Sequence, residues 1–475
     1  MADYDVAVIG AGAAGLSVAA IAAGLGLRTA LIERGRMGGD CLNYGCVPSK
    51  ALLAAAHAAA EARRAHRFGI RLPAPEIDWV GVRAHVRGAI AHIAPNDSVA
   101  RFRAMGVEVI EASAHFTGPD ALAAGSRPLT FRRAVIAAGS SAVVPPIEGL
   151  HAAPFLTNET IFDLEDPPGH LIVIGGGPIG LELAQAHARL GCLVTVIEAA
   201  TIAFRDDPEC VAALRRALEA DGVEIRENSR VARVEQENPG LAVLLADGTR
   251  IAGTHLLVAT GRAPRLAGLD LAAARVTAGP AGIRTDRALR SVSNRRIWAA
   301  GDIADPAGLG PRAFTHVCSQ HAAIIARSML FRLPARLSYD ALPRVTYTDP
   351  EIAQIGLTEA EAREAGHDRL TLTRWPLVEN DRLVAEGRPE GLVKLVIDAK
   401  GRLLGASVVG PRAGDMAGTL GLVIGRRLPL SALASLVLPY PTMGEGAKRA
   451  AGEFYTPRLL SPATRTIVRL LKHLP

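Results

Sequence analysis

Cysteine is scarce in this chain, which has only five in 475 residues. A secreted scaffold held together by disulfides needs a denser set, so that class is excluded. Residues 1–5 carry no basic segment, and glycines break the apolar stretch that follows, so we expect neither a signal peptide nor a membrane span. We therefore expect a cytoplasmic protein, in which closely spaced cysteines are catalytic or metal-binding rather than structural.

Lysine is also rare, at five of the 53 basic residues, and the net charge of +6 comes from arginines scattered among acids. A nucleic-acid-binding protein gathers its basic residues into a patch, so we expect no nucleic-acid partner. The chain is 49% hydrophobic and has no low-complexity tract. Its length fits two to four well-cored domains.

Two of the few cysteines, Cys41 and Cys46, stand close together shortly after a glycine-rich loop. A dithiol beside a bound redox cofactor passes electron pairs to a sulfur or soft-metal acceptor. In a regular helix these residues would lie about 7.5 Å apart along the axis, whereas a disulfide requires Cα atoms within about 6.8 Å. Either the segment is irregular, which Asn43 and Gly45 permit, or no bond forms. A structural metal site would need two more soft ligands, and none has matching spacing.

The glycine-rich loop occurs twice, each time between a short apolar strand and a helix, with an acid at the end of the next strand. The first glycine permits a tight turn, the second lets the backbone approach a pyrophosphate, and the third lets the helix pack on the sheet, while the acid binds a ribose. The interval from first glycine to acid is 23 residues in both copies, which argues against glycines that serve helix packing alone. The two sets are Gly10, Gly12, Gly15 and Glu33, then Gly175, Gly177, Gly180 and Glu198.

Two dinucleotide sites imply FAD and a nicotinamide coenzyme. Glu198 would accept hydrogen bonds from both hydroxyls of an unphosphorylated ribose and repel a 2′-phosphate, so we expect NADH rather than NADPH. Arg205, close by in the sequence, weakens that preference.

With the cysteine pair, the chain resembles the class I FAD-dependent pyridine nucleotide–disulfide oxidoreductases over nearly its whole length. Residues 134–139 and 257–261 are similar to the segments in which the family's chain passes between domains, and they end at Gly139 and Gly261. Residues 296–302 are similar to the second flavin motif, so the resemblance implies that Asp302 holds the ribityl chain.

This resemblance implies an α/β fold with two Rossmann-like domains and a C-terminal α+β dimerisation domain. The expected FAD-binding domain covers residues 1–145 and 268–338, the inserted NAD(P)-binding domain 146–267, and the dimerisation domain of a homodimer 340–475. Asp247 and Gly248 predict a hairpin inside the inserted domain.

The resemblance also implies roles for the reactive side chains. Cys46 would be the thiol against the flavin and Cys41 the interchange thiol, joined in a redox-active disulfide, with Lys50 and Glu182 paired beside the flavin and the nicotinamide. Electrons would then flow from NADH through FAD to the cysteines. Cys318 falls in a segment that passes the flavin, and both a buried structural role and a functional thiol remain open. Cys192 and Cys210 are expected to be small buried residues.

Disulfide-reducing members carry a histidine near the C-terminus that moves protons to and from the thiols. Here Tyr440 stands in its place, five residues before Glu445. A phenol, with a reference pKa near 10, is a poor proton shuttle beside an imidazole near 6.5. This departure argues against glutathione reductase and dihydrolipoyl dehydrogenase activity and resembles the mercuric reductase branch. The chain lacks that branch's C-terminal cysteine pair and N-terminal Cys-x-x-Cys domain.

We therefore predict a flavoprotein that passes electrons from NAD(P)H to a thiol-reactive or soft-metal acceptor. Mercuric reductase is the first alternative, dihydrolipoyl dehydrogenase the second, and a redox-sensing FAD- and NAD-binding protein the non-enzymatic one. The apolar, basic tail at residues 461–475 predicts a helix docked on its own dimer rather than on a membrane surface.

Overall fold

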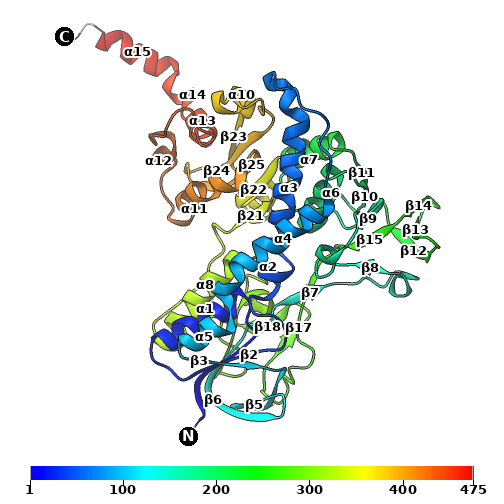
Figure 1. The fold of residues 1–475 in the computed structure, drawn as a ribbon. Coiled ribbons are helices and arrows are strands. Elements are labelled where there is room, and N and C mark those ends of the chain that lie inside the picture. Colours follow the sequence, from blue (N-terminus) through cyan, green and yellow to red (C-terminus); the bar gives the residue numbers. More distant parts are fainter. Residues whose placement is uncertain (1, 473, 475) are drawn as a thin grey trace. The chain divides into compact units, whose positions relative to one another are not determined.

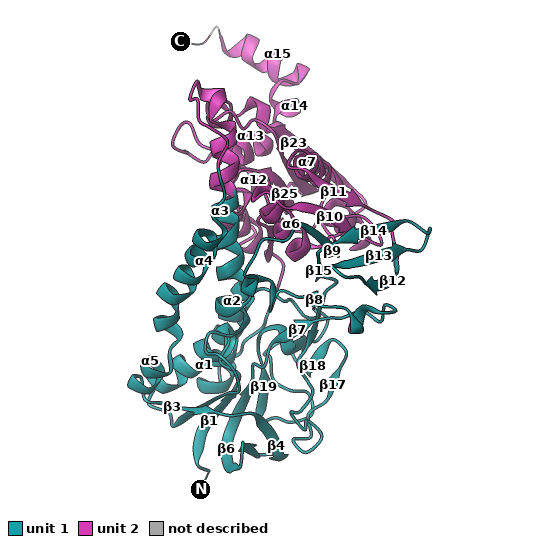
Figure 2. Ribbon diagram, turned by 45° about the vertical axis from the view of Figure 1, so that its right-hand side comes forward, with its two compact units in different colours: residues 1–56, 76–175, 230–338 teal, residues 57–75, 176–229, 339–475 magenta. Residues whose placement is uncertain are grey.

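The computed structural model describes residues 2–472 and 474 of the chain. These residues form two compact units, which Figure 2 colours separately. Unit 1 comprises residues 1–56, 76–175 and 230–338, and unit 2 comprises residues 57–75, 176–229 and 339–475.

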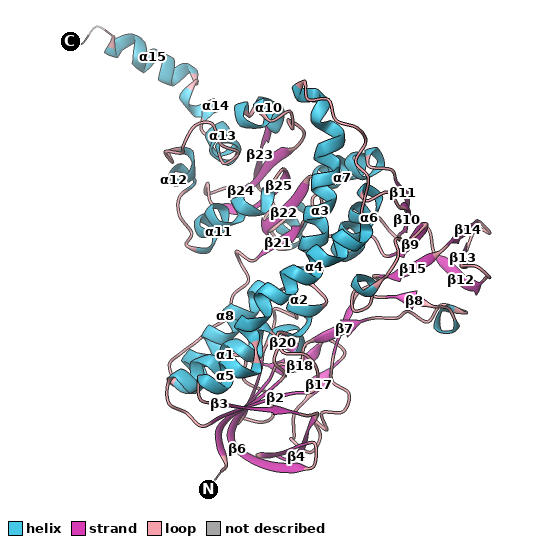
Figure 3. Ribbon diagram, viewed as in Figure 1, coloured by secondary structure: helices cyan, strands magenta, loops and turns pink. Residues whose placement is uncertain are grey.

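Unit 1 is built on a largely parallel sheet with strand order β3-β2-β1-β6-β5-β4, and β19 pairs with β6. Five of the six residues of the central strand β1 are buried, as expected when a parallel sheet is covered on both faces. Helix α1 packs against α8 beside this sheet (Figures 1 and 3). The strands are β1 (Tyr4–Ile9), β2 (Thr29–Glu33), β3 (Val107–Glu111), β4 (Ala114–Gly118), β5 (Ala121–Ala124), β6 (Arg127–Ile136) and β19 (Ile297–Ala299), and the helices are α1 (Ala13–Gly24), α2 (Gly39–Asn43), α4 (Trp79–Ile93), α5 (Val99–Ala104) and α8 (Thr315–Ile325). The predicted strand, helix and strand around the first glycine loop are thus confirmed.

A second part of unit 1 contains three parallel strands and a three-stranded antiparallel sheet. Thr249 N donates to Oδ1 of Asp247 at 2.9 Å in the turn between β13 and β14, which confirms the predicted hairpin. The parallel strands are β8 (Phe155–Leu156), β9 (His170–Ile174) and β15 (His255–Val258), and the antiparallel ones are β12 (Val231–Gln236), β13 (Leu241–Leu245) and β14 (Arg250–Gly253).

Unit 2 combines a parallel strand pair with a five-stranded antiparallel sheet of order β21-β22-β25-β24-β23. Buried aliphatic residues from this sheet and from α11, α12 and α13 form one apolar core. The strands are β10 (Leu193–Ile197), β11 (Val223–Arg226), β21 (Pro343–Thr346), β22 (Glu351–Gly356), β23 (Leu370–Pro376), β24 (Leu392–Asp398) and β25 (Leu403–Gly410). The helices are α6 (Pro178–Arg189), α7 (Pro208–Ala220), α10 (Asp381–Ala385), α11 (Ala417–Gly425), α12 (Leu430–Ala434), α13 (Glu445–Glu453), α14 (Thr456–Leu459) and α15 (Pro462–Leu471).

The architecture confirms the predicted α/β class, with Rossmann-like parallel sheets and a C-terminal antiparallel sheet. The second segment of unit 1 ends at Gly175, inside the second glycine loop, so the two compact units do not correspond to the three expected domains. The boundaries at 145, 267 and 340 therefore stay predictions. Among the described residues, no helix has both the length and the apolar character needed to cross a bilayer.

Candidate redox site

The first glycine loop has backbone geometry that only glycine adopts without strain. Gly10 has φ +102°, and a Cβ there would lie 2.4 Å from the carbonyl oxygen of Ala137. A Cβ on Gly15 would lie 1.9 Å from the oxygen of Gly10, so the helix packs directly on the loop. Gly12 caps the N-terminus of α1. A Cβ there would meet only the Cα of Gly39, at 3.9 Å. The loop therefore leaves a cradle in front of the helix N-terminus, where an anion is favoured.

The second loop repeats this arrangement. Gly175 has φ +115°, and a Cβ there would lie 2.4 Å from the oxygen of Ala259. Gly177 caps α6, and Gly180 is buried within that helix. Gly139 and Gly261, which follow β6 and β15, both have positive φ, and a Cβ on either would meet no described atom within 4 Å.

The acid after each loop holds the loop itself. Glu33 accepts hydrogen bonds from Ala11 N at 2.6 Å and Gly35 N at 2.7 Å. Glu198 likewise accepts hydrogen bonds from Gly176 N at 2.7 Å and from Ala200 N at 2.9 Å. Each carboxylate is thus held in place beside its glycine loop.

The two cysteines lie on separate helices, because α2 ends at Asn43 and α3 (Cys46–Arg64) begins at Cys46. The interruption confirms the irregular segment that the sequence left as one of two alternatives. Neither cysteine is in a disulfide in this structure, and the two thiols lie close enough for Cys46 to affect the ionisation of Cys41. The disulfide stays a prediction.

The two thiols differ in their electrostatic environment. The hydrogen bond to Cys46 and burial raise the pKa of Cys41 well above its ordinary value. Cys46 is exposed, begins a 19-residue helix whose N-terminus favours negative charge, and lies 3.3 Å from Oγ1 of Thr315, the first residue of α8. Lys50 follows one turn later on the same helix face and donates to Oγ of Ser49 at 3.4 Å. In the reduced pair, the negative charge is favoured on Cys46 and the proton on Cys41.

A polar network joins Asp302 to α2, the helix that carries Cys41. Asp302 accepts from Oγ of Ser140 at 2.5 Å, and burial raises the pKa of its carboxyl. Arg262 donates to Ser140 at 2.8 Å and lies 3.1 Å from Oδ1 of Asp40, the residue before Cys41. The sequence identified Asp302 but missed Ser140, Arg262 and Asp40, which no motif marks.

Cys318 lies in the buried wall of the same unit. Its sulfur would be 3.5 Å from a Cβ on Gly301, and burial raises the pKa of the thiol to about 12. Nδ1 of the buried His321 accepts from Gly301 N at 3.0 Å, and burial lowers the pKa of this imidazole to about 4. A buried, protonated thiol is unreactive, so the structural role of Cys318 is favoured.

The predicted residues of unit 2 have their own partners. Glu182 on α6 is 5% exposed and accepts from Tyr347 N at 2.9 Å. Tyr440 is exposed and donates to Oδ2 of Asp381 at 2.6 Å, whereas Glu445 begins α13. The sequence missed Asp381, which lies 59 residues away from its partner.

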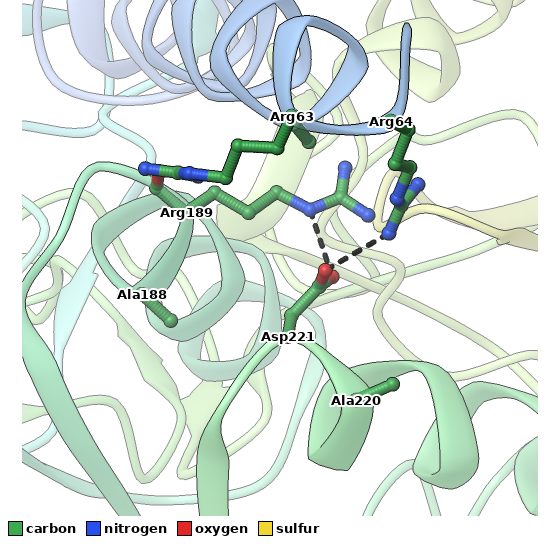
Figure 4. A pocket seen from close by; sticks show the side chains of 7 residues that line it. Arg63, Arg64, Ala188, Arg189, Ala220 and Asp221 are labelled. Carbon is green, nitrogen blue, oxygen red and sulfur yellow. Dashed lines mark hydrogen bonds and ion pairs between the residues drawn. The ribbon is translucent and has the colours of Figure 1, made fainter. Parts of the chain in front are cut away.

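The C-terminal half of α3, in unit 2, ends in a cluster of buried charges. Arg189 is 2% exposed, its Nε donates to Oδ2 of Asp221 at 2.7 Å, and its Nη1 lies 2.9 Å from Oδ2 of Asp349. Arg64 donates to Oδ1 of Asp221 at 3.0 Å, and Arg388 pairs with Asp349. Figure 4 shows both contacts of Asp221 converging from α3 and α6.

A cavity of about 340 Å³ opens beside this cluster, lined by Ala60, Arg63, Arg64, Ala188, Arg189, Ala220 and Asp221. His57, one turn before Ala60 on α3, also lies close to these charges. Burial, together with Arg189 and Arg388, lowers the pKa of His57 to about 4.

The structure places the predicted site residues in both units. Unit 1 holds both cysteines, Lys50, Asp302, the first glycine loop, and the glycines at 139, 175 and 261. Unit 2 holds Glu182, Glu198, Tyr440, Glu445 and the rest of the second loop. Within residues 2–472 and 474, no three histidine, cysteine or acidic side chains are grouped so that they could hold a metal ion.

Two family models match the chain. The model described as pyridine nucleotide-disulphide oxidoreductase matches residues 4–323, and the model of the dimerisation domain of these proteins matches residues 342–451.

Proteins of known function are similar over nearly the whole length. Mercuric reductase of Streptomyces lividans is 36% identical, with 95% of this chain and 96% of the relative covered. Dihydrolipoyl dehydrogenase of Thermus scotoductus is 35% identical, with 95% and 97% covered.

Solved structures show the same likeness. The Cu(II) complex of the HOCl-induced flavoprotein disulfide reductase RclA from Escherichia coli superposes with a TM-score of 0.83 and 27% identity, with 94% of this chain and 98% of that chain covered. LpdA from Mycobacterium tuberculosis gives a TM-score of 0.85 and 25% identity, with 94% and 99% covered.

Proposed function

The chain belongs to the pyridine nucleotide–disulfide oxidoreductases and is an FAD-dependent enzyme of that family, and within this activity we propose that it reduces a soft-metal or thiol-reactive acceptor at Cys41 and Cys46. The observation that carries the proposal is the pair itself, two thiols in contact on separate helices beside Thr315. The dimerisation domain supports a homodimer, and we propose a cytoplasmic location.

The residues of unit 1 fit FAD. The cradle at Gly12 and the N-terminus of α1 suit its pyrophosphate, Glu33 suits the ribose of its adenosine, and buried Asp302 suits its ribityl hydroxyls. When bound, FAD accepts a hydride from the nicotinamide coenzyme and passes an electron pair to a disulfide.

The cysteines then carry the electron pair outward. Reduction of a Cys41–Cys46 disulfide breaks the S–S bond and leaves two thiol groups, of which Cys46 is stabilised as thiolate by the N-terminus of α3. Two sulfurs bind a soft divalent ion, and re-forming the disulfide releases two electrons, which reduce one Hg(II) to Hg(0) or two Cu(II) to two Cu(I). Lys50 on the same helix supplies a cation near these charges, and we assign Glu182 to the nicotinamide site.

We propose NADH as the electron donor. The Glu198 carboxylate is fixed by two backbone N–H groups at the end of β10, where it would accept from ribose hydroxyls. A 2′-phosphate at this place would meet a fixed negative charge. NADPH is therefore the weaker donor.

Tyr440 supports an acceptor that needs no proton donor. Its hydroxyl is bound to Asp381, whose charge raises the pKa of the phenol further. Reduction of a metal ion by two thiolates requires no proton at a leaving sulfur, unlike reduction of a substrate disulfide. The Cu(II) complex of the similar RclA also favours a metal acceptor.

An anaerobic titration with NADH tests the thiol cycle. We expect a long-wavelength absorption band from a thiolate beside oxidised flavin, and we expect Cys46→Ser to abolish it. Cys318→Ser is the matched control, because this buried thiol should leave the band unchanged. A band that persists in Cys46→Ser would refute the assignment of the two cysteines.

The acceptor is tested by adding candidates to the reduced enzyme. Oxidation of NADH driven by Hg(II) in excess thiol would identify the mercuric reductase alternative, and oxidation driven by Cu(II) a copper acceptor. Rapid oxidation with lipoamide would identify a dihydrolipoyl dehydrogenase and refute the argument from Tyr440. A protein that binds FAD and NADH but turns over none of these would be a redox sensor.

A further inference from the structure

The last helix, α15 (Pro462–Leu471), stands out because none of its ten residues is buried. Figure 1 shows it extending from α13 and α14, away from the antiparallel sheet of the same unit. Four large aliphatic side chains of α15 are each at least 53% exposed, namely Ile467, Val468, Leu470 and Leu471. Leu459 and Leu460, just before it, are 66% and 54% exposed. This is an apolar face without cover in unit 2.

The helix separates its apolar and basic residues. At about 100° per residue, the four aliphatic side chains fall in an arc of about 160°, and the basic ones in an arc of about 60° on the other side. The basic residues are Arg465, Arg469 and Lys472. A helix with this division lies flat in a membrane interface, with its apolar face among the acyl chains and its basic face at the headgroups.

The charge of the tail favours one of the two surfaces on which α15 could dock, a second copy of this chain or a membrane. Residues 454–475 contain four arginines and lysines and no aspartate or glutamate. Of the net charge of +6, the tail contributes +4, so the remainder of a second copy carries +2 and offers no net negative charge to attract the segment. An anionic phospholipid surface attracts it.

We propose that α15 docks the enzyme on an anionic phospholipid surface, peripherally and reversibly. This inference does not depend on the identity of the electron acceptor. A ten-residue helix buries too few apolar side chains for permanent insertion, so binding depends on both faces of the helix. Docking through α15 would bring the enzyme to the bilayer surface, although no helix among its described residues could span the membrane.

The test is co-sedimentation of the full-length, FAD-loaded protein with large unilamellar vesicles. One set contains phosphatidylcholine with roughly 30% phosphatidylglycerol and the other phosphatidylcholine alone. We expect binding to the first set only, weakening as salt is added.

Two double variants separate the contributions of the two faces. Arg465→Glu with Arg469→Glu should weaken binding by about 25-fold or more, since each basic residue contributes about five-fold. Ile467→Ser with Leu470→Ser should abolish binding at unchanged net charge. The matched control is Arg216→Glu with Arg336→Glu, which changes the net charge equally at exposed positions outside the tail and should leave binding within about two-fold.

Light scattering and NADH turnover complete the test. We expect all variants to keep the mass and turnover of the unmodified protein in solution. If the apolar-face variant loses mass, a second copy covers α15 and the proposal is wrong. Equal sedimentation of the unmodified protein and the basic-face variant with anionic vesicles would overturn it as well.

Discussion

The hydroxyl of Tyr440 donates a hydrogen bond of 2.6 Å to the carboxylate of Asp381, and this contact raises the pKa of the phenol. A phenol held protonated cannot act as a proton shuttle near neutral pH. We therefore predict that Tyr440→Phe lowers turnover with a soft-metal acceptor by no more than about three-fold, the scale of one exposed hydrogen bond. Steady-state oxidation of NADH measures it.

Tyr440→His is the converse test, because it restores an imidazole near the reference pKa of 6.5. We expect lipoamide-driven oxidation to rise while the metal-driven rate stays within a few-fold. A loss of about 100-fold or more in Tyr440→Phe would mean that the phenol performs acid–base catalysis after all.

Glu198 and Glu33 form a matched pair for testing coenzyme choice. In Glu198→Gln, only one oxygen can accept, so one of the two backbone contacts is lost together with the negative charge. We predict that the ratio of kcat/KM for NADH to that for NADPH falls by about ten-fold, equivalent to about 1.4 kcal/mol.

The same change at the first loop is the control. Glu33→Gln should reduce retention of FAD during gel filtration without altering that ratio, because it fixes the other loop. An unchanged ratio in Glu198→Gln would show that this acid does not select the coenzyme.

The buried cluster around Arg189 predicts a large effect on stability. Arg189→Met leaves Asp221 and Asp349 without their most buried cation, and removing one partner of a buried ion pair costs about 3–5 kcal/mol. Urea unfolding followed by circular dichroism measures the loss.

Arg374→Met provides the comparison, because the Arg374–Glu209 pair is largely exposed. An exposed pair contributes about 0–1 kcal/mol, so this variant should unfold close to the unmodified protein. Equal losses of unfolding free energy in Arg189→Met and Arg374→Met would show that burial does not determine how much these ion pairs contribute to stability.

His57 predicts acid lability. Its folded pKa of about 4 lies below the unfolded value near 6.5, because burial and the charges of Arg189 and Arg388 disfavour the imidazolium. The stability it contributes is present above pH 6.5 and is lost as the pH falls toward 4, for a total of about 3 kcal/mol. Thermal melting from pH 7 to pH 4 should show a smaller decline in His57→Gln. Parallel melting curves would exclude this histidine as the source.

The glycine loops could be predicted because their requirements are local. Gly10 has a positive φ, and a Cβ on Gly15 would lie only 1.9 Å from the oxygen of Gly10, so no other residue type fits at either position. The neighbouring strand and helix follow from hydrophobic runs. The break between the cysteines was also foreseeable from Gly45, although the sequence alone did not decide between a bond and none.

The partners of the site residues were not predictable. Arg262 lies 122 residues from Ser140, and Thr315 lies 269 residues from Cys46. Their contacts depend on how strands and helices far apart in sequence are assembled, and arginines and threonines are too common for their type to indicate a role. The charge cluster at Arg189 could not be predicted for the same reason.

The gap between α2 and α3 has a mechanical consequence. Tyr44 and Gly45 form a two-residue joint between the helices: Tyr44 N donates to the oxygen of Asp40 at 2.8 Å at the end of α2, and the oxygen of Gly45 accepts from Ser49 N at 3.1 Å at the start of α3. A Cβ on Gly45 would lie 3.0 Å from the backbone oxygen of Asp40, so a larger residue would crowd the joint. The proposed cycle would therefore change the separation of the two sulfurs through the torsions between Tyr44 and Gly45, with each helix keeping its own end fixed.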